Sequence, residues 1–514
     1  MSLYPVARFA DLPEDRATEI KIGDKKIVLI RFDDQIRAFQ GECPHAGAPL
    51  SDGAICAGKL ICPWHKAAFS INDGSLCEPP ALDALQRFAA RVVDGEVLVD
   101  DQPLPPRDEP CRDENGATDS RCFVIVGAGA GGTAAACALR EKGFGGRLVL
   151  IDPQTEAGYD RTALSKFVIA GDMQPEEVPA MREAEFYREQ DIRRVTAKVT
   201  ALDARARRIS LDDGQHIDYD SALIATGGIA QRPDLPGAGL PQVLTLRSRD
   251  DAQAILDAAP PDGNAVIIGD SFIGLEAASA LRKRGLSVTL LARHETPFIK
   301  QFGERIGSAL RRLHEQNGVL FRTHVEAVRF DGEHHLQSVV LNNGERLPAD
   351  LVLVGTGVRP ATDFVQGVEL AEDGSLSVDA GMQVCAGLWA AGDIATFPLS
   401  GTVLRIEHRR LAQQQARIAA LNMPGGNEQF RDVPFFWTFH FGKRIDYLGH
   451  AEQWDDIIFR GEPERFVFIG LICKDGQVVA AVACKYERAM ALLAERMKQP
   501  LTVEQALVLI DECE

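Results

Sequence analysis

Two glycine-rich turns, each between an apolar strand and a helix, constrain the fold of this chain more than any other feature. The segments are VIVGAGAGGTAAACALREKG and VIIGDSFIGLEAASALRKRG, whose first glycines are Gly127 and Gly269. Strands that alternate with helices in this way are typical of parallel sheets covered on both faces. The sequence therefore predicts two separate α/β nucleotide-binding folds.

The first turn has the complete pattern of a dinucleotide site. Gly127, Gly129 and Gly132 are spaced as G-x-G-x-x-G, and the next strand, RLVLID, ends in Asp152. The glycines let the backbone approach a pyrophosphate at the helix N-terminus, and the carboxylate can accept hydrogen bonds from a ribose. A turn with a purely structural role is the alternative.

The second turn is imperfect, because Ser271 stands between Gly269 and Gly274 where a glycine is expected. A serine fits there if its backbone angles allow. The next strand, SVTLLA, ends without an acid, and Arg293 and His294 follow. A cation in place of a carboxylate suits the 2'-phosphate of NADPH, so NADH and NADPH both stay open, as does an Arg293 that is only a solvated charge.

The N-terminal part carries two further motifs, Cys43-x-His45 and Cys62-x-x-His65, each with one thiolate and one imidazole. A [2Fe-2S] centre with two cysteines on one iron and two histidines on the other needs this ligand set. Structural zinc is the alternative, although zinc sites usually present cysteine pairs and histidine pairs, whereas these motifs interleave the two residue types.

Composition argues against nucleic acid and membranes as partners. The 514 residues are 45% apolar and 25% charged, and 74 acidic residues outnumber 56 basic ones, for a net charge of -18. This excess repels phosphate backbones and anionic lipids. The start of the chain lacks a signal-peptide pattern, and the odd count of eleven cysteines favours metal or redox use over disulfides. We therefore expect a cytoplasmic protein, and its oligomeric state stays open.

The motifs resemble two known families. Residues 1–105 resemble the Rieske ferredoxins through PHAGAPLSDG and CPWHKAAF. Residues 120–514 resemble the FAD-dependent pyridine-nucleotide reductases, specifically the ferredoxin reductases of aromatic-ring dioxygenase systems and the apoptosis-inducing-factor-like proteins. The matching segments are YDRTALSK, LIATGG, the second GLE, VGTGVRP, AAGDIA, IEH and PFFWT. The order of the two parts is similar to that of the fused apoptosis-inducing-factor-like proteins.

Pattern and resemblance together predict a multidomain fold: a small all-β Rieske domain, two Rossmann-like α/β domains of the glutathione-reductase type, and a small α+β C-terminal domain. The expected division is a Rieske domain at 1–105, a linker rich in Pro, Asp and Glu at 106–120, a discontinuous FAD-binding domain at 121–240 and 365–427, an NAD(P)H-binding domain at 241–364 and a C-terminal reductase domain at 428–514.

The resemblance also implies which residues hold the flavin. In these reductases the first fold binds FAD and the inserted second fold binds NAD(P)H. Asp152 would contact the FAD ribose, and Asp393 would contact the ribityl or pyrophosphate region. The other residues that the resemblance places near FAD are Arg161, Lys166, Thr226 and Gly227.

Three residues are expected at the reactive ring. Glu276 would pair with Lys166, because a cation near the flavin raises its potential and a carboxylate moderates that charge. Trp437 would bring an aromatic surface from the last domain to the flavin edge. The alternatives are a surface lysine, a helix-face glutamate and a core tryptophan. Arg409 follows His408 where many relatives carry tryptophan.

The reaction class follows from a missing pair of cysteines. Disulfide reductases with this fold carry a redox pair near the segment DRTALSK, which has no cysteine here. The sequence therefore predicts an NAD(P)H-dependent oxidoreductase that passes electrons from FAD to the fused cluster and on to an unidentified acceptor, such as an oxygenase or a cytochrome. Two alternatives are a redox-sensing interaction protein of the apoptosis-inducing-factor type and a reductase component that supplies an oxygenase.

Overall fold

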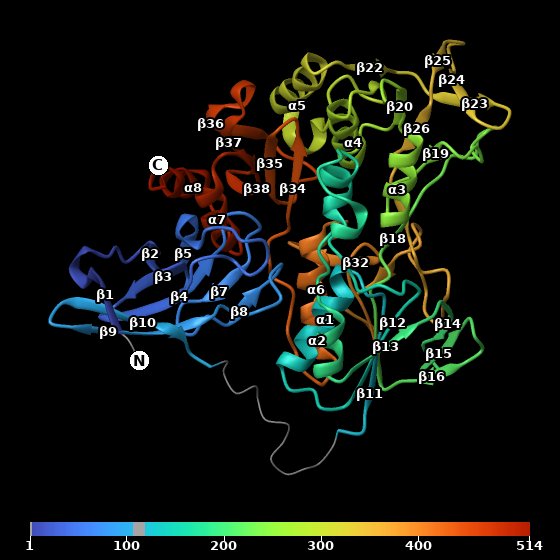
Figure 1. The fold of residues 1–514 in the computed structure, drawn as a ribbon. Helices are drawn as coiled ribbons and strands as arrows, with labels where there is room; N and C mark the ends of the chain where they lie inside the picture. The colour runs from blue at the N-terminus through green and yellow to red at the C-terminus, as the bar shows by residue number, and fades with distance from the viewer. Residues whose placement is uncertain (1–2, 106–118, 514) are drawn as a thin grey trace.

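The computed structural model describes residues 3–105 and 119–513, so most of the predicted linker lies outside the described residues. The N-terminal part contains two antiparallel sheets (Figure 1). The six-stranded sheet has the order β1 (Leu3–Arg8), β10 (Glu96–Pro103), β9 (Arg87–Val93), β4 (Gln35–Gln40), β3 (Lys25–Phe32) and β2 (Thr18–Ile22). The four-stranded sheet consists of β5 (Ala54–Cys56), β6 (Lys59–Ile61), β7 (Ala68–Ser70) and β8 (Leu76–Glu78).

The first glycine-rich turn opens a largely parallel sheet of six strands. Their order is β13 (Ile192–Thr196), β12 (Arg147–Asp152), β11 (Cys122–Val126), β17 (Ser221–Ile224), β31 (Leu388–Ala390) and β30 (Gln383–Cys385). Helices α1 (Ala130–Glu141) and α6 (Arg409–Asn422) lie side by side against it (Figure 1). Because β31 and α6 come from far along the chain, this sheet supports a discontinuous first domain.

The second glycine-rich turn opens a parallel sheet of five strands. Their order is β19 (Val243–Leu244), β26 (Leu351–Val354), β20 (Asn264–Ile268), β21 (Ser287–Ala292) and β22 (Val319–Thr323). The helices of this part are α3 (Arg249–Ala258), α4 (Phe272–Lys283) and α5 (Ile299–Gln316). A small antiparallel sheet of β23 (Ala327–Gly332), β24 (Leu336–Leu341) and β25 (Arg346–Pro348) follows β22.

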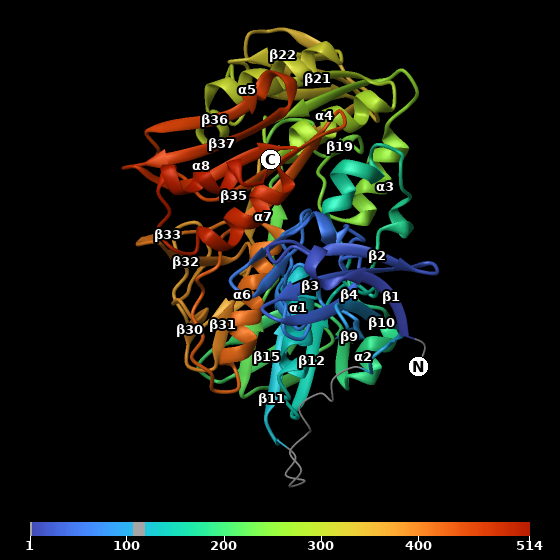
Figure 2. The same ribbon diagram turned by 90° about the vertical axis from the view of Figure 1, so that its left-hand side faces the viewer.

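The C-terminal part is an antiparallel sheet followed by two helices. The strand order is β34 (Phe435–His440), β35 (Lys443–Gly449), β38 (Gln477–Cys484), β37 (Val467–Lys474) and β36 (Asp456–Glu462). Helices α7 (Glu487–Arg496) and α8 (Val503–Asp511) close the chain. Figures 1 and 2 show this part next to the N-terminal sheets, and Ala491 of α7 packs into one hydrophobic cluster with Ala54, Ile61 and Ala68. The predicted multidomain fold is thus confirmed.

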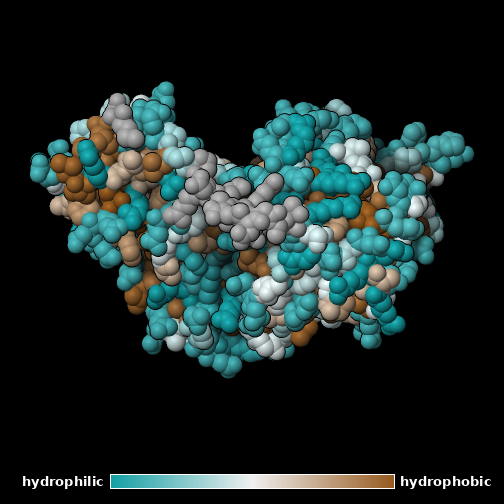
Figure 3. Space-filling view, turned by 90° about the horizontal axis from the view of Figure 1, so that it is seen from below, coloured by the Kyte–Doolittle hydropathy of each residue, from teal (hydrophilic) through white to brown (hydrophobic). Residues whose placement is uncertain are grey.

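The outer surface is mainly hydrophilic on the face seen from below (Figure 3). Hydrophobic side chains gather toward its left-hand side, the side of the N-terminal sheets (Figure 3). Val92 and Val93 of β9 in these sheets are exposed. Within the described residues, we find no helix that combines the length and the apolar character needed to cross a bilayer.

Candidate functional site

Two loops of similar backbone form the Cys and His cage. Cys43 N donates to Ala48 O at 2.8 Å in the loop after β4, and Cys62 N donates to Ala67 O at 2.8 Å in the loop between β6 and β7. Each loop thereby presents its cysteine and its histidine from one tight turn.

The four predicted ligands lie together as two pairs. The Nδ1 atoms of His45 and His65 are 3.1 Å apart, and the thiols of Cys43 and Cys62 lie close enough for each to shift the pKa of the other. No group of three or more His, Cys, Asp or Glu side chains converges on one point anywhere in residues 3–105 and 119–513. Two thiols on one side and two imidazoles on the other fit a cluster with two irons better than a single zinc ion.

The protonation states of the cage also suit iron. Burial and the charge of Arg409 lower the pKa of His45 to about 3, and burial keeps the pKa of His65 well below its ordinary value. Both rings are therefore neutral at pH 7, which is the form that binds metal. The contact with Cys43 lowers the pKa of Cys62 to about 7, while the same contact raises that of Cys43.

The first glycine-rich turn leaves room for a pyrophosphate. Gly127 has a φ of 103°, and a Cβ on Gly132 would lie 1.8 Å from Gly127 O, so both positions require glycine. A Cβ on Gly129 would meet nothing within 4 Å, which leaves open space above the N-terminus of α1. This arrangement fits the dinucleotide half of FAD.

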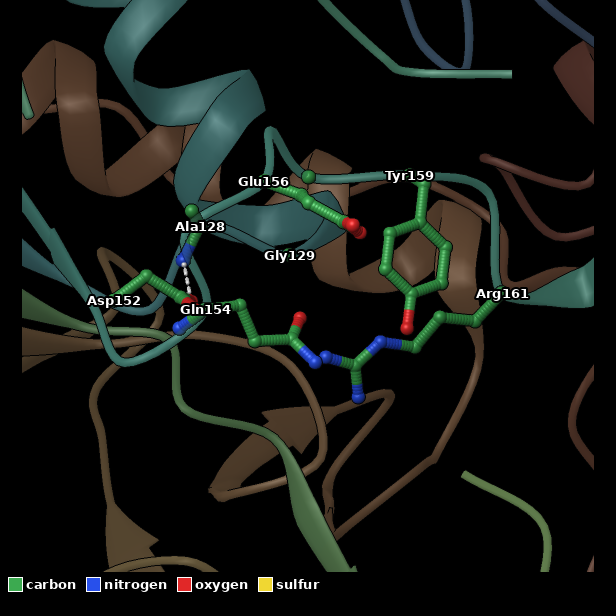
Figure 4. Close-up of a pocket in the computed structure, with 8 residues that line it drawn as sticks. Ala128, Gly129, Asp152, Gln154, Glu156, Tyr159 and Arg161 are labelled. Atoms are coloured by element: carbon green, nitrogen blue, oxygen red, sulfur yellow. Dashed lines mark hydrogen bonds between the residues drawn. The ribbon is translucent and has the colours of Figure 1, made fainter. Parts of the chain in front are cut away.

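Asp152 closes one end of this site (Figure 4). Its Oδ2 accepts a hydrogen bond from Ala128 N at 2.7 Å, and its Oδ1 accepts one from Gln154 N at 2.9 Å. In Figure 4, Arg161 extends along the same hollow toward Gln154, and the hollow is lined by Ala128, Gly129, Asp152, Gln154, Glu156, Gly158, Tyr159 and Arg161. Asp152 and Arg161 thus line the same cavity.

Asp393 lies beside a further cation. Arg247 Nη2 is 2.8 Å from Asp393 Oδ2, and the Nε of Arg247 is buried without a partner among the described groups. Gly227 has a φ of 72° and lies against Arg247, and Thr226 Oγ1 donates to Ala361 O at 2.8 Å. The orphaned donor of Arg247 suits an anionic or carbonyl group of the bound cofactor.

Lys166 and Glu276 are brought together in the interior. Lys166 lies on a π-helical turn, Leu164–Val168, and its Nζ is 3.0 Å from Glu276 Oε2 on α4. The two residues are 8% and 4% exposed, so the alternatives of a surface lysine and a helix-face glutamate are wrong. Thr438 Oγ1 donates to Glu276 Oε1 at 2.7 Å. Each carboxylate oxygen therefore has a partner.

Trp437 connects this pair to the cage. Lys166 Nζ lies 4.7 Å from the centre of the indole, and the ring of His65 lies 5.6 Å from it on the Rieske side. The residue is partly buried and also packs against the hydrophobic cluster of the C-terminal part. Its indole therefore lies between the cage and the Lys166–Glu276 pair, and its place at the flavin edge stays a prediction.

In the second turn, Ser271 takes the place of glycine without strain. Its φ of -73° is ordinary, and its Oγ accepts a hydrogen bond from Gly274 N at 3.2 Å as the N-cap of α4. Gly269 does require glycine, with a φ of 108°. Past β21, the imidazole of His294 lies 3.3 Å from Asp270, and the exposed Arg293 forms no ion pair within the described part of the chain.

Sequence reasoning missed the residues that join the Rieske part to the reductase. Arg409 Nη1 is 3.2 Å from His45 Nε2, and Arg409 Nε is 3.2 Å from Asp160 Oδ1. The fully buried Lys66 pairs with Asp446 at 3.0 Å. The one signal in the sequence was the arginine at position 409, where many relatives carry tryptophan.

Comparisons with known proteins agree with this geometry. The model of the pyridine nucleotide-disulphide oxidoreductase family matches residues 122–416, that of the Rieske [2Fe-2S] domain residues 2–89, and that of the reductase C-terminal domain residues 435–512.

Similar proteins cover either nearly the whole chain or its reductase part. Apoptosis-inducing factor 3 of Mus musculus is 35% identical over 507 residues, which are 95% of this chain and 83% of that protein. The ferredoxin–NAD(+) reductase component of the biphenyl dioxygenase system of Paraburkholderia xenovorans is 35% identical over 376 residues, which are 72% of this chain and 91% of that protein. The crystal structure of the covalent putidaredoxin reductase–putidaredoxin complex has a TM-score of 0.72 at 26% identity and covers 76% of this chain and 98% of that chain. The chain therefore belongs to the pyridine nucleotide-disulphide oxidoreductases, as a Rieske-fused, NAD(P)H-dependent oxidoreductase of the ferredoxin reductase type that uses FAD and a [2Fe-2S] cluster.

Proposed function

We propose that this protein transfers electrons from its flavin site to its own Rieske centre, and from there to a separate acceptor. When bound, FAD takes a hydride from NAD(P)H, and the cluster takes electrons one at a time. The observation that carries the proposal is the position of Trp437, whose indole contacts both Lys166 of the flavin site and the cage ligand His65.

Buried ion pairs support a fixed position of the Rieske part. Besides the Lys66–Asp446 pair, Arg410 Nη2 bonds Glu78 Oε2 at 2.8 Å, with the two side chains 5% and 8% exposed. The same guanidinium donates to Lys66 O at 2.9 Å. A buried charge without its partner is costly, so these pairs favour the docked arrangement in which the cage faces the flavin site.

The cofactor assignments are part of the same proposal. Cys43, His45, Cys62 and His65 would hold the cluster, and the first glycine-rich turn with Asp152, Arg161 and Asp393 would hold FAD. The second turn would hold NAD(P)H. The domain boundaries given above remain a prediction, as does the cytoplasmic location, which suits the ten unpaired cysteines among the described residues.

For the final acceptor we propose a ferredoxin-type or oxygenase partner. The solved putidaredoxin reductase–putidaredoxin complex and the dioxygenase reductase components support this class. The redox-sensing alternative rests on the likeness to apoptosis-inducing factor 3. The two differ in rate, because a reductase is reoxidised quickly once an acceptor is added, whereas a sensor stays reduced.

Anaerobic mixing with NADH or NADPH tests the route. Flavin absorbance is followed by stopped flow, and the cluster is followed by freeze-quench EPR. We expect a rhombic Rieske signal after flavin bleaching, at a rate independent of protein concentration. Cys43→Ala should take hydride without giving this signal, while Cys56→Ala on β5, outside the cage, should match the wild type. A cluster that stays oxidised, or zinc in place of iron and sulfide, overturns the proposal.

A further inference from the structure

A buried chain of hydrogen bonds runs from Glu276 away from the cage. Thr438 Oγ1 lies 2.7 Å from Glu276 Oε1 and 2.9 Å from His440 Nε2. His440 Nδ1 in turn lies 3.3 Å from His314 Nε2 on α5. Thr438, His440 and His314 are all 0% exposed. This series of hydrogen bonds therefore links Glu276 on α4 to α5 through strand β34.

The hydrogen-bond partners of each residue in this series determine which atom carries the proton. Lys166 and Ser165 both donate to Glu276 Oε2, so Glu276 accepts as a carboxylate. Burial lowers the pKa of His440 to about 3 and that of His314 well below its ordinary value, so each ring is neutral, with one donor and one acceptor. Because Thr438 gives its only hydrogen to Glu276, it must accept from His440, and His440 must accept from His314. Every donor then points toward Glu276.

The series of hydrogen bonds ends at His314 with an unsatisfied polar atom. Nδ1 of His314 is buried and has no partner among the described residues, while the ring stands against Phe441 and Phe321 with centroids 5.0 and 6.2 Å away. A buried acceptor without a partner is costly, and an ordered water is the usual remedy. A water bound at this orphaned nitrogen would extend the ordered hydrogen bonds beyond His314.

We propose that His314, His440 and Thr438 form a proton relay that serves Glu276 at the flavin site. The inference rests on the proposed function, whose overall reaction sets the need for it. Oxidation of one NAD(P)H by two one-electron acceptors yields NAD(P)+, two reduced acceptors and one proton. The cage ligand His65 lies against Trp437, whereas the relay leads through His314 on α5 and so gives this proton a path of its own.

The steps balance at every atom. With every donor pointing toward Glu276, the inward steps come first. Water gives a proton to Nδ1 of His314, Nε2 of His314 gives its proton to Nδ1 of His440, Nε2 of His440 gives its proton to the oxygen of Thr438, and Thr438 gives its own to Oε1 of Glu276. Glu276 is then protonated and both imidazoles carry their hydrogen on Nδ1. The outward sequence reverses these steps from that state and ends with release of the Nδ1 proton of His314 to water.

Threonine 438 offers a matched pair of variants. Thr438→Val keeps the shape but removes the hydroxyl, and Thr438→Ser keeps the hydroxyl. Proton release after mixing with NADH is followed by stopped flow with a pH-indicator dye, and ferricyanide serves as the one-electron acceptor so that the reading does not depend on the cluster. We expect Thr438→Val to slow proton release by more than about tenfold and to change its solvent deuterium isotope effect, while Thr438→Ser keeps the wild-type rate and isotope effect.

A second variant tests the relay independently, in case Thr438→Val does not fold. His314→Phe, placed among Phe441 and Phe321, should slow proton release in the same way with normal FAD content, and the exposed His216→Phe should not. Equal release rates and isotope effects in Thr438→Val and Thr438→Ser, or in His314→Phe and the wild type, overturn the relay. Cluster reduction by EPR is read separately, so a failed relay with a reducible cluster leaves the proposed function intact.

Discussion

The imidazole of His65 lies 5.6 Å from the indole of Trp437, with the ring planes inclined at 47°. His65 belongs to the N-terminal cage and Trp437 to the C-terminal sheet, so this contact joins the two ends of the chain. Lys166 lies against the same indole and Arg444 also packs on it, with Cζ 4.8 Å from the ring centre. The indole is therefore held in place by two cations as well as by the cage.

Replacing this indole tests whether it lies on the electron path. Trp437→Leu removes the aromatic bridge, and we expect cluster reduction to slow by about tenfold or more while hydride uptake by the flavin stays near the wild-type rate. Trp437→Phe keeps an aromatic ring and should lose much less. Freeze-quench EPR gives the cluster rate and absorbance gives the flavin rate. Equal cluster rates in the Leu and Phe variants would remove Trp437 from the path.

The buried pair between Lys66 and Asp446 should matter for stability. Asp446→Asn leaves the fully buried ammonium of Lys66 without its 3.0 Å counter-charge, and such a loss costs about 3–5 kcal/mol. Glu42→Gln is the matched control, because it breaks the exposed pair with Lys26 and should cost under ~1 kcal/mol. Urea unfolding followed by circular dichroism measures both. Similar midpoints for the two variants would contradict the prediction.

Protonation of buried histidines should lower the stability of the folded protein in acid. In the folded state burial holds the pKa of His440 at about 3 and that of His314 well below its ordinary value, whereas an unfolded histidine takes up a proton near pH 6.5. The unfolded state therefore binds more protons below about pH 6.5, so stability falls as the pH drops from there toward 3.

His314→Phe should make stability fall less steeply with acid, because it removes one of the buried histidines whose pKa is lowered in the folded state. The urea midpoint, measured between about pH 7 and 4, gives the slope for each variant. His216→Phe is the control, since His216 is exposed and its loss should leave the slope unchanged. An acid limb as steep in His314→Phe as in the wild type would assign the sensitivity to other groups.

Local motifs were predictable from the sequence because they depend on spacing. Cys43-x-His45 and Cys62-x-x-His65 each lie in one tight turn, so the residue types and spacing are enough to indicate the cage. The requirement for glycine at Gly127 and Gly269 is also local, since it follows from a positive φ.

Contacts between distant segments were not predictable in this way. Lys166 and Glu276 were paired only through the family resemblance. The arginine at position 409 is unusual among relatives, but neither it nor Lys66 indicates which residue it faces. The pairs His314–His440 and Arg410–Glu78 likewise join separate elements, and each needs the folded arrangement of two domains. When two residues are far apart in the sequence, their types alone do not show that they meet in the fold.

Arg293 should determine how strongly the second nucleotide-binding fold binds NADP+ relative to NAD+. It follows Ala292, the last residue of β21, where an acid would hold the ribose of NADH, and it is exposed and forms no ion pair in the described part of the chain. A free guanidinium there can bind a 2'-phosphate. We expect Arg293→Ala to weaken NADP+ binding by about tenfold, or ~1.4 kcal/mol, and to leave NAD+ binding unchanged. Titration calorimetry with both nucleotides measures this, and Arg312→Ala, an exposed arginine on α5, is the control. An equal loss of affinity for both coenzymes would mean that Arg293 does not bind the 2'-phosphate.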